Sequence, residues 1–195
     1  MVTKRSIAFM AVTVLPGAVA AQHAPAPRST SAAPVHVAPA EAKQFDFLVG
    51  EWEVVVRPKA SGLVQRIHGA PRILGTWKAW RALDGWGIED ELKLMDGSGN
   101  PTSLNHAVRV YDAAAKRWNQ TWLDVYRGRF TTATAEWRNG EMVLSSRGTD
   151  QEGEPFVTRT RYYDITATSF KFQQDRSYDD GRTWDEGVLR IEAKR

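Results

Sequence analysis

The chain of 195 residues contains no cysteine. Disulfides, thiolate metal sites, iron–sulfur clusters and a cysteine nucleophile are therefore excluded. A large excess of one charge is also lacking, because 26 Lys and Arg stand against 23 Asp and Glu and give a formal net charge of +3. With 42% hydrophobic and 25% charged residues, the composition is that of an ordinary globular protein with one domain of moderate size.

Recognisable catalytic motifs are lacking too. The sequence has no Gly-x-Ser-x-Gly elbow, no phosphate-binding glycine loop and no dinucleotide fingerprint. Of its four histidines, His68 falls in an expected loop and His106 in an expected strand, without the spacing of a zinc site. The acids over 89–91 alternate between the two faces of a strand, so they form no ready acid/base pair. The sequence therefore favours a non-catalytic protein and predicts no metal and no cofactor.

The N-terminus has the pattern of a secretory signal peptide. Lys4 and Arg5 precede an apolar stretch over 7–20 that is too short to span a bilayer comfortably and is interrupted by Pro16. We predict that residues 1–21 are removed and that the protein is exported to the periplasm or secreted, without stable membrane insertion. Loss of the two basic residues lowers the formal charge from +3 to +1. The mature chain then gives no charge-based reason to expect nucleic acid.

The next segment differs in composition from everything after it. Residues 22–41 are rich in Ala and Pro and have almost no large apolar side chain. Such a segment cannot bury enough surface to offset its ordering entropy, so it is expected to be a semi-rigid tether. The folded domain is expected over 42–195, which also contains all eight tryptophans.

From residue 42 onward the sequence alternates short β-type segments with turn residues. The apolar run over 45–49 predicts one helical turn, followed by a first strand that begins near Trp52. Turn signals such as Asn139-Gly140 and Asp180-Gly181 separate the later segments. Nine further strands are predicted near 72–82, 86–95, 103–111, 117–126, 129–138, 141–149, 156–165, 169–177 and 184–193.

Ten strands with short links and no long helical period predict an all-β fold. A flat sheet of this size would expose two long edges and one large apolar face. Closure removes both problems, so the prediction is a single antiparallel up-and-down barrel of about ten strands. A β-sandwich is the main alternative.

Several short motifs resemble a known family. Residues 45–54, Phe-Asp-Phe-Leu-Val-Gly-Glu-Trp-Glu-Val, together with Val110-Tyr111-Asp112, Trp118 and Trp122-Leu123-Asp124, look like an uncharacterised bacterial family of exported calycin-like barrels, related in fold to lipocalins and nitrobindins. The similarity covers nearly all of 44–195. In lipocalins the first-strand Trp packs under an Arg from the last strand. The resemblance therefore implies that Trp52 and Arg190 lock one end of the barrel.

The segment over 177–184, Ser-Tyr-Asp-Asp-Gly-Arg-Thr-Trp, is similar to the Asp-box of sialidase propellers. It occurs once, and this chain is too short to supply the repeated blades of a propeller. Its physical content is a tight hairpin in which Asp side chains accept backbone N–H bonds, Gly181 has a positive φ and Trp184 covers the turn.

The candidate site is the barrel interior, where small barrels hold one ligand among a few polar groups. If the strand face that carries Leu104 and Val108 points inward, His106 lies inside. By the same alternation Asp90 accompanies Ile88, and Gln174 accompanies its apolar neighbours. The candidate ligand-binding residues are Trp77, Asp90, His106, Trp122 and Gln174. The alternative is that these polar groups satisfy one another in a filled core.

Three functional hypotheses follow. The first is an exported, non-catalytic barrel that binds a small apolar or amphipathic molecule. The second is a filled barrel that acts through exposed aromatic residues such as Trp80 or Trp137. The third is haem or enzymatic chemistry, by analogy with the histidine-ligated haem of nitrobindins. Nitrobindin-type barrels take that ligand from later in the chain, and no histidine follows His106.

Overall fold

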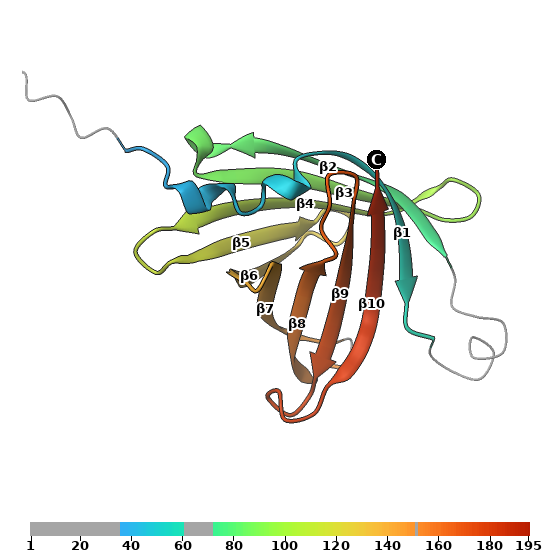
Figure 1. Ribbon diagram of the computed structural model, residues 1–195. Coiled ribbons are helices and arrows are strands. Elements are labelled where there is room, and N and C mark those ends of the chain that lie inside the picture. The colour runs from blue at the N-terminus through green and yellow to red at the C-terminus, as the bar shows by residue number, and fades with distance from the viewer. Residues whose placement is uncertain (1–35, 61–71, 151) are drawn as a thin grey trace, which may run out of the picture. The chain divides into compact units, whose positions relative to one another are not determined.

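The computed structural model describes residues 36–60, 72–150 and 152–195. The predicted signal peptide, most of the predicted tether and His68 lie outside these ranges. Ten antiparallel strands close into one barrel with the order β1-β10-β9-β8-β7-β6-β5-β4-β3-β2 (Figure 1). Each strand pairs with its neighbours in the chain, and β1 pairs with β10. The predicted all-β, up-and-down barrel is therefore confirmed.

The strand bounds agree with the predicted ones to within a few residues. They are β1 (Gly50–Pro58), β2 (Ile73–Ala82), β3 (Gly87–Met95), β4 (Pro101–Asp112), β5 (Arg117–Asp124), β6 (Arg129–Arg138), β7 (Glu141–Thr149), β8 (Pro155–Tyr163), β9 (Ser169–Ser177) and β10 (Asp185–Lys194).

Alternation within each strand creates the core. In β1 the side chains of Trp52, Val54 and Val56 are buried, whereas those of Glu51 and Glu53 are exposed. A period of two places one set inside the barrel and the other in water, and this is why the segment forms a strand.

Turn residues occupy the backbone conformations that the hairpins require. Between β6 and β7, Asn139 and Gly140 both have positive φ, 52° and 83°, as a two-residue hairpin turn demands. In the β9–β10 turn, Gly181 has a φ of 86°, and a Cβ added there would meet the Trp184 ring at 3.2 Å. Asp179 accepts hydrogen bonds from the Thr183 hydroxyl at 2.7 Å and the Thr183 N–H at 2.8 Å. The hairpin expected from the Asp-box pattern is confirmed.

The short helical turn predicted before the first strand is confirmed, and the structure shows that this segment closes one end of the barrel. It consists of two 3-10 helices, η1 (Ala40–Lys43) and η2 (Asp46–Leu48), which form the blue part of the chain in Figure 1. Phe45, between them, is fully buried and meets the Trp118 ring edge-on at 4.9 Å. The Trp118 indole N–H also donates to the Gln44 side chain at 3.1 Å. We call this the closed end.

The lock on Trp52 is made by a different arginine from the one expected. Arg190 is exposed on the outer wall, where its Nε donates to the Gln173 side chain at 3.3 Å. Register explains the error, because Arg190 pairs with Arg57, far along β1 from Trp52. The guanidinium over the Trp52 ring, 4.2 Å from its centroid, belongs to Arg195. Its attraction to the ring is a cation–π interaction.

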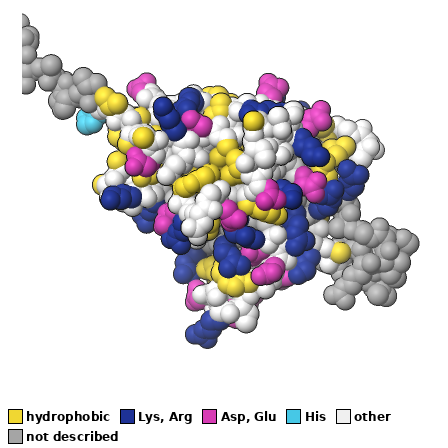
Figure 2. Space-filling view, viewed as in Figure 1, with side chains coloured by type: hydrophobic (Ala, Val, Ile, Leu, Met, Phe, Trp, Pro, Cys, Tyr) yellow, Lys and Arg dark blue, Asp and Glu magenta, His cyan; other side chains and the backbone are white. Residues whose placement is uncertain are grey.

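Charged side chains of both signs are interspersed on the face of the molecule shown in Figure 2. Apolar side chains show between them in small groups. Within the described residues, no helix is long and apolar enough to cross a membrane.

Candidate ligand-binding cavity

The barrel interior is not completely filled. Residues from eight strands enclose a cavity of about 210 Å³, in which aromatic and aliphatic walls surround a few polar groups. The lining residues are Trp77, Asp90, Leu92, Asn105, Ala107, Arg109, Gln120, Trp122, Leu144, Thr160, Tyr162, Phe172, Gln174, Leu189 and Ile191. This composition is typical of a small-molecule pocket, although the volume is below the range of about 300–1,000 Å³ that such pockets usually have.

The floor of the cavity carries a buried ion pair. Asp90 of β3 and Arg109 of β4 contact each other directly, and each side chain is only 4% exposed. The Trp77 indole N–H donates to Asp90 Oδ1 at 2.7 Å, and Arg109 Nε donates to Gln120 Oε1 at 3.1 Å. These contacts join four neighbouring strands, β2 to β5, in one polar network.

The network sits directly above the closed end. The Arg109 guanidinium lies over the Phe45 ring, 5.3 Å from its centroid. Burial lowers the pKa of Arg109, but the ordinary value of an arginine is so far above neutrality that the group stays protonated. Burial also raises the pKa of the adjacent Tyr162 phenol, and Arg109 opposes this shift. The floor therefore presents a paired charge and a neutral phenol.

The cavity continues into a wider pocket at the opposite end of the barrel. This open end is formed by the turns over 96–100, 125–128 and 178–184. The pocket there measures about 480 Å³ and shares Asn105, Trp122 and Gln174 with the cavity. Because the same side chains line both spaces, the cavity and the pocket at the open end are adjacent.

Four of the five candidate residues lie where they were expected. Trp77, Asp90, Trp122 and Gln174 all line the cavity. His106 does not, because the face of β4 that points inward carries Ala107, Arg109 and Tyr111.

The orientation of β4 has a physical cause. The outward face carries the more apolar residues, Leu104, Val108 and Val110, so alternation alone favours the opposite orientation. Arg109 can pair with Asp90 only from inside, and this pairing favours the observed face. His106 consequently lies on the outer wall, 3.5 Å from Glu89 Oε2 and beside the Trp80 ring. It cannot ligate a group held in the interior.

Arg109 and Gln120 were missed as site residues. The available signal was the position of Arg109 between Ala107 and Tyr111, since a lone arginine within a buried strand face needs an acidic partner nearby. Asp90 on the preceding strand was the obvious candidate, but its link to Arg109 becomes visible only once the strand register is known.

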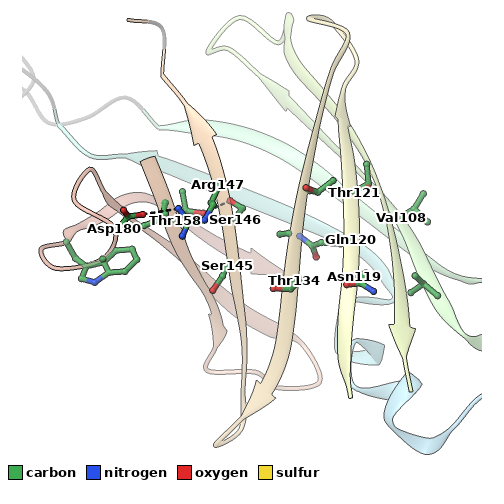
Figure 3. Close-up of a pocket in the computed structure, with 16 residues that line it drawn as sticks. Val108, Asn119, Gln120, Thr121, Thr134, Ser145, Ser146, Arg147, Thr158 and Asp180 are labelled. Atoms are coloured by element: carbon green, nitrogen blue, oxygen red, sulfur yellow. Dashed lines mark hydrogen bonds and ion pairs between the residues drawn. The ribbon is translucent and has the colours of Figure 1, made fainter. Parts of the chain in front are cut away.

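A larger depression, of about 830 Å³, lies on the outer wall over β4 to β8 and the β9–β10 turn (Figure 3). Its labelled side chains, including Thr121 and Thr134, are spread along the strands and do not converge on a point. The charges of Arg147 and Asp180 are satisfied by each other at 2.9 Å. This depression therefore offers no group aimed at a ligand.

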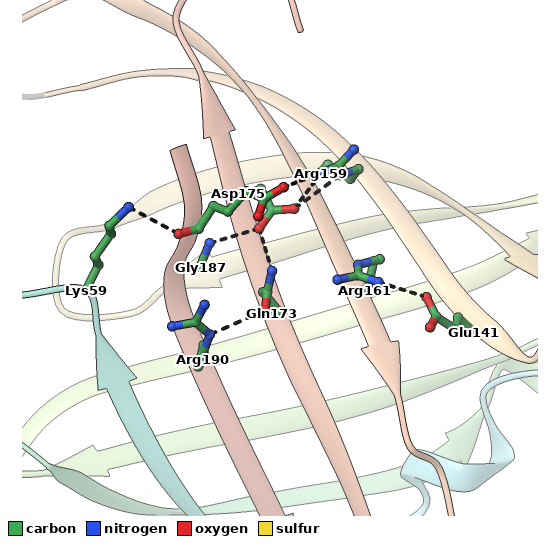
Figure 4. A network of polar contacts seen from close by, with 9 residues as sticks. Lys59, Glu141, Arg159, Arg161, Gln173, Asp175, Gly187 and Arg190 are labelled. Atoms are coloured by element: carbon green, nitrogen blue, oxygen red, sulfur yellow. Dashed lines mark hydrogen bonds and ion pairs between the residues drawn. The ribbon is translucent and has the colours of Figure 1, made fainter. Parts of the chain in front are cut away.

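Another polar network lies on the outer wall around Asp175 (Figure 4). This carboxylate accepts hydrogen bonds from Arg159 Nη2 at 2.9 Å, from the Gly187 N–H at 2.9 Å and from the Gln173 amide at 2.8 Å. Burial alone would raise the pKa of Asp175, but these three donors outweigh it and lower the pKa. The network is satisfied internally and serves to join β8, β9 and β10.

Within the described residues, no three histidine or acidic side chains are grouped so that they could hold a metal ion. A comparison with models of known protein families finds no match, and a search of curated proteins finds none either. The ten-stranded antiparallel barrel is compatible with a calycin-like fold.

Proposed function

We propose that this protein is an exported, non-catalytic barrel of the calycin-like type that binds a small apolar or amphipathic molecule in its interior. The observation that carries the proposal is the cavity of about 210 Å³, which has Trp77 and Trp122 in its walls and opens into the pocket at the open end. Aromatic walls favour burial of apolar surface, and the polar floor supplies orientation. Export is supported by the signal-peptide pattern over 1–21.

A fluorescent probe tests the proposal directly. N-phenylnaphthylamine is neutral and apolar, and its emission rises when it leaves water. We expect the purified barrel to enhance its emission saturably and to melt at a higher temperature in its presence. The variant Ala107→Phe fills the cavity and should abolish this binding. Val108→Phe places the same ring on the outer wall of the same strand and should leave binding unchanged.

Thermal unfolding of both variants separates loss of the cavity from loss of the fold. Ala107→Phe adds volume where space exists, so it should still unfold cooperatively. Binding that survives in a folded Ala107→Phe barrel would show that the probe sits elsewhere, and no binding to the unaltered barrel would refute the proposal.

A surface interaction module is the second candidate. It is favoured by the exposure of Trp80 and Trp137, at 41% and 38%. These residues belong to β2 and β6, which are not neighbours in the barrel. The two rings therefore form no continuous patch along adjacent strands, and the interior remains the better-supported site.

A further inference from the structure

The open end of the barrel contains an arginine whose hydrogen-bonding capacity is largely unused. Arg176 of β9 follows Gln174 on the inward face and pairs in register with the buried Thr158. It lines the pocket at the open end, and Gln174 lines both that pocket and the cavity. Two residues along a strand span about 7 Å, so Arg176 lies one layer above the cavity.

The Arg176 side chain is held in place on two sides. Its guanidinium lies over the Phe156 ring, 4.3 Å from the centroid, and its Nη1 donates to the Tyr178 hydroxyl at 3.1 Å. A stacked guanidinium with one fixed hydrogen bond keeps little of its rotamer freedom. It is therefore ready to receive a ligand without a further cost of ordering.

Nη2 is the guanidinium nitrogen that is left for a ligand, because Nη1 is engaged by the Tyr178 hydroxyl and Nε is buried. Nε is buried and has no hydrogen-bond partner among the described residues. Arg176 also makes no ion pair with any carboxylate in the described part of the chain. A guanidinium N–H without a carboxylate partner can form a charge-assisted hydrogen bond with an oxyanion, and such bonds are about twice as strong as neutral ones.

Two acids at the open end are already paired with other arginines, and Arg129, which lines the same pocket, adds a second positive charge. Asp124 is paired with Arg127 at 2.8 Å, and Arg147 is paired with Asp180. Neither acid is therefore available to neutralise Arg176. An incoming anion would meet a fixed positive charge at the entrance to an apolar cavity.

We propose that the ligand of this barrel is amphipathic and carries an oxyanion such as a carboxylate, which Arg176 binds at the open end while the apolar part enters the cavity. This inference rests on the proposed function, because it specifies the ligand class of the same site.

The test uses displacement of N-phenylnaphthylamine by decanoate and by decanol, which differ in the head group. At about pH 8 the carboxylate is fully ionised. We expect decanoate to displace the probe at lower concentration than decanol does. Acetate at the same concentrations should leave the probe bound, because it does not fill the cavity, and displacement by acetate would overturn the amphipathic assignment.

Two variants test the role of Arg176. Arg176→Gln should weaken decanoate by about tenfold or more and leave decanol unchanged, because only the charge-assisted hydrogen bonds are lost. Arg190→Gln removes the same charge from the outer wall and should change neither. If Arg176→Gln fails to fold, Arg176→Lys retains the charge but loses the guanidinium that stacks on Phe156, and it should weaken decanoate alone.

The outcomes separate this inference from the proposed function. Equal binding of decanoate and decanol, or an equal loss of both in Arg176→Gln, would refute the role of Arg176 while the cavity remains a binding site. Failure of the probe and both competitors to bind the unaltered barrel would refute the proposed function and this inference with it.

Discussion

Replacing Asp90 by leucine should leave the Arg109 guanidinium as an uncompensated charge inside the barrel. Both side chains are 4% exposed, so neither can turn to water without opening the wall. Removing one partner of such a pair costs about 3–5 kcal/mol, a large share of the ~5–15 kcal/mol by which domains are stable. For a chain of this size the melting temperature should fall by roughly 6–20 °C.

The double variant Asp90→Leu with Arg109→Met distinguishes a coupled pair from two separate contacts. Removal of both charges abolishes the desolvation penalty, and apolar side chains of similar volume fill the space. What remains is the loss of partners for the Trp77 indole N–H and the Gln120 carbonyl, about 1–3 kcal/mol for each group left buried. If each single variant loses about 3–5 kcal/mol, the loss in the double variant should be smaller than the sum of the two single losses by about 4 kcal/mol.

Urea unfolding followed by tryptophan fluorescence measures all four proteins of this cycle. Equal slopes of free energy against urea would show that the midpoints report stability alone. Additive losses, or single losses below about 1 kcal/mol, would contradict the reasoning. They would mean that water reaches the floor of the cavity and solvates the charges.

Two further predictions concern the wall and the closed end. Because the pKa of Asp175 is lowered in the folded state, its ionised form stabilises the fold at a pH above the ordinary pKa of an aspartate. This stabilisation should be lost as the pH falls below about 4. Asp175→Asn should remove this part of the pH dependence of stability, as measured by thermal unfolding. Arg195→Ala removes the cation over Trp52 and the hydrogen bond to the Val49 carbonyl, so the free energy of unfolding in urea should fall by about 1–2 kcal/mol. An equal fall in Arg190→Ala would instead support Arg190 as the partner of Trp52.

The number and order of the strands could be predicted because their signals are local. A hairpin such as Asn139-Gly140 is specified by two residues that tolerate positive φ, and a strand such as β1 by its own alternation. Neither signal needs knowledge of what lies across the barrel. The closed topology then followed from the number of strands and the shortness of the links.

The side that each strand turns inward required non-local information. In β4 the choice depended on the contact between Arg109 and Asp90, which lie on neighbouring strands. The lock on Trp52 depended on the register of β1 against β10, which places Lys194 opposite Glu53 and so brings the chain end beside Trp52. A shift of one residue in the register of a strand turns the opposite set of its side chains inward, so neither the inward face of β4 nor the partner of Trp52 could be predicted without the register.

The existence of the cavity follows from side-chain size once the register is known. On the inward face of β7 the residues shrink toward the open end, from Met142 and Leu144 to Ser146 and Gly148. On β8 the inward face passes from Tyr162 at the closed end to Thr160 and Thr158, and Phe156 follows at the rim of the open end. Large side chains fill the closed end, and the short ones in the middle layers of β7 and β8 leave space between them. The interior is therefore solid over the helical segment and hollow toward Arg176, and this gradient gives a ligand a single direction of entry.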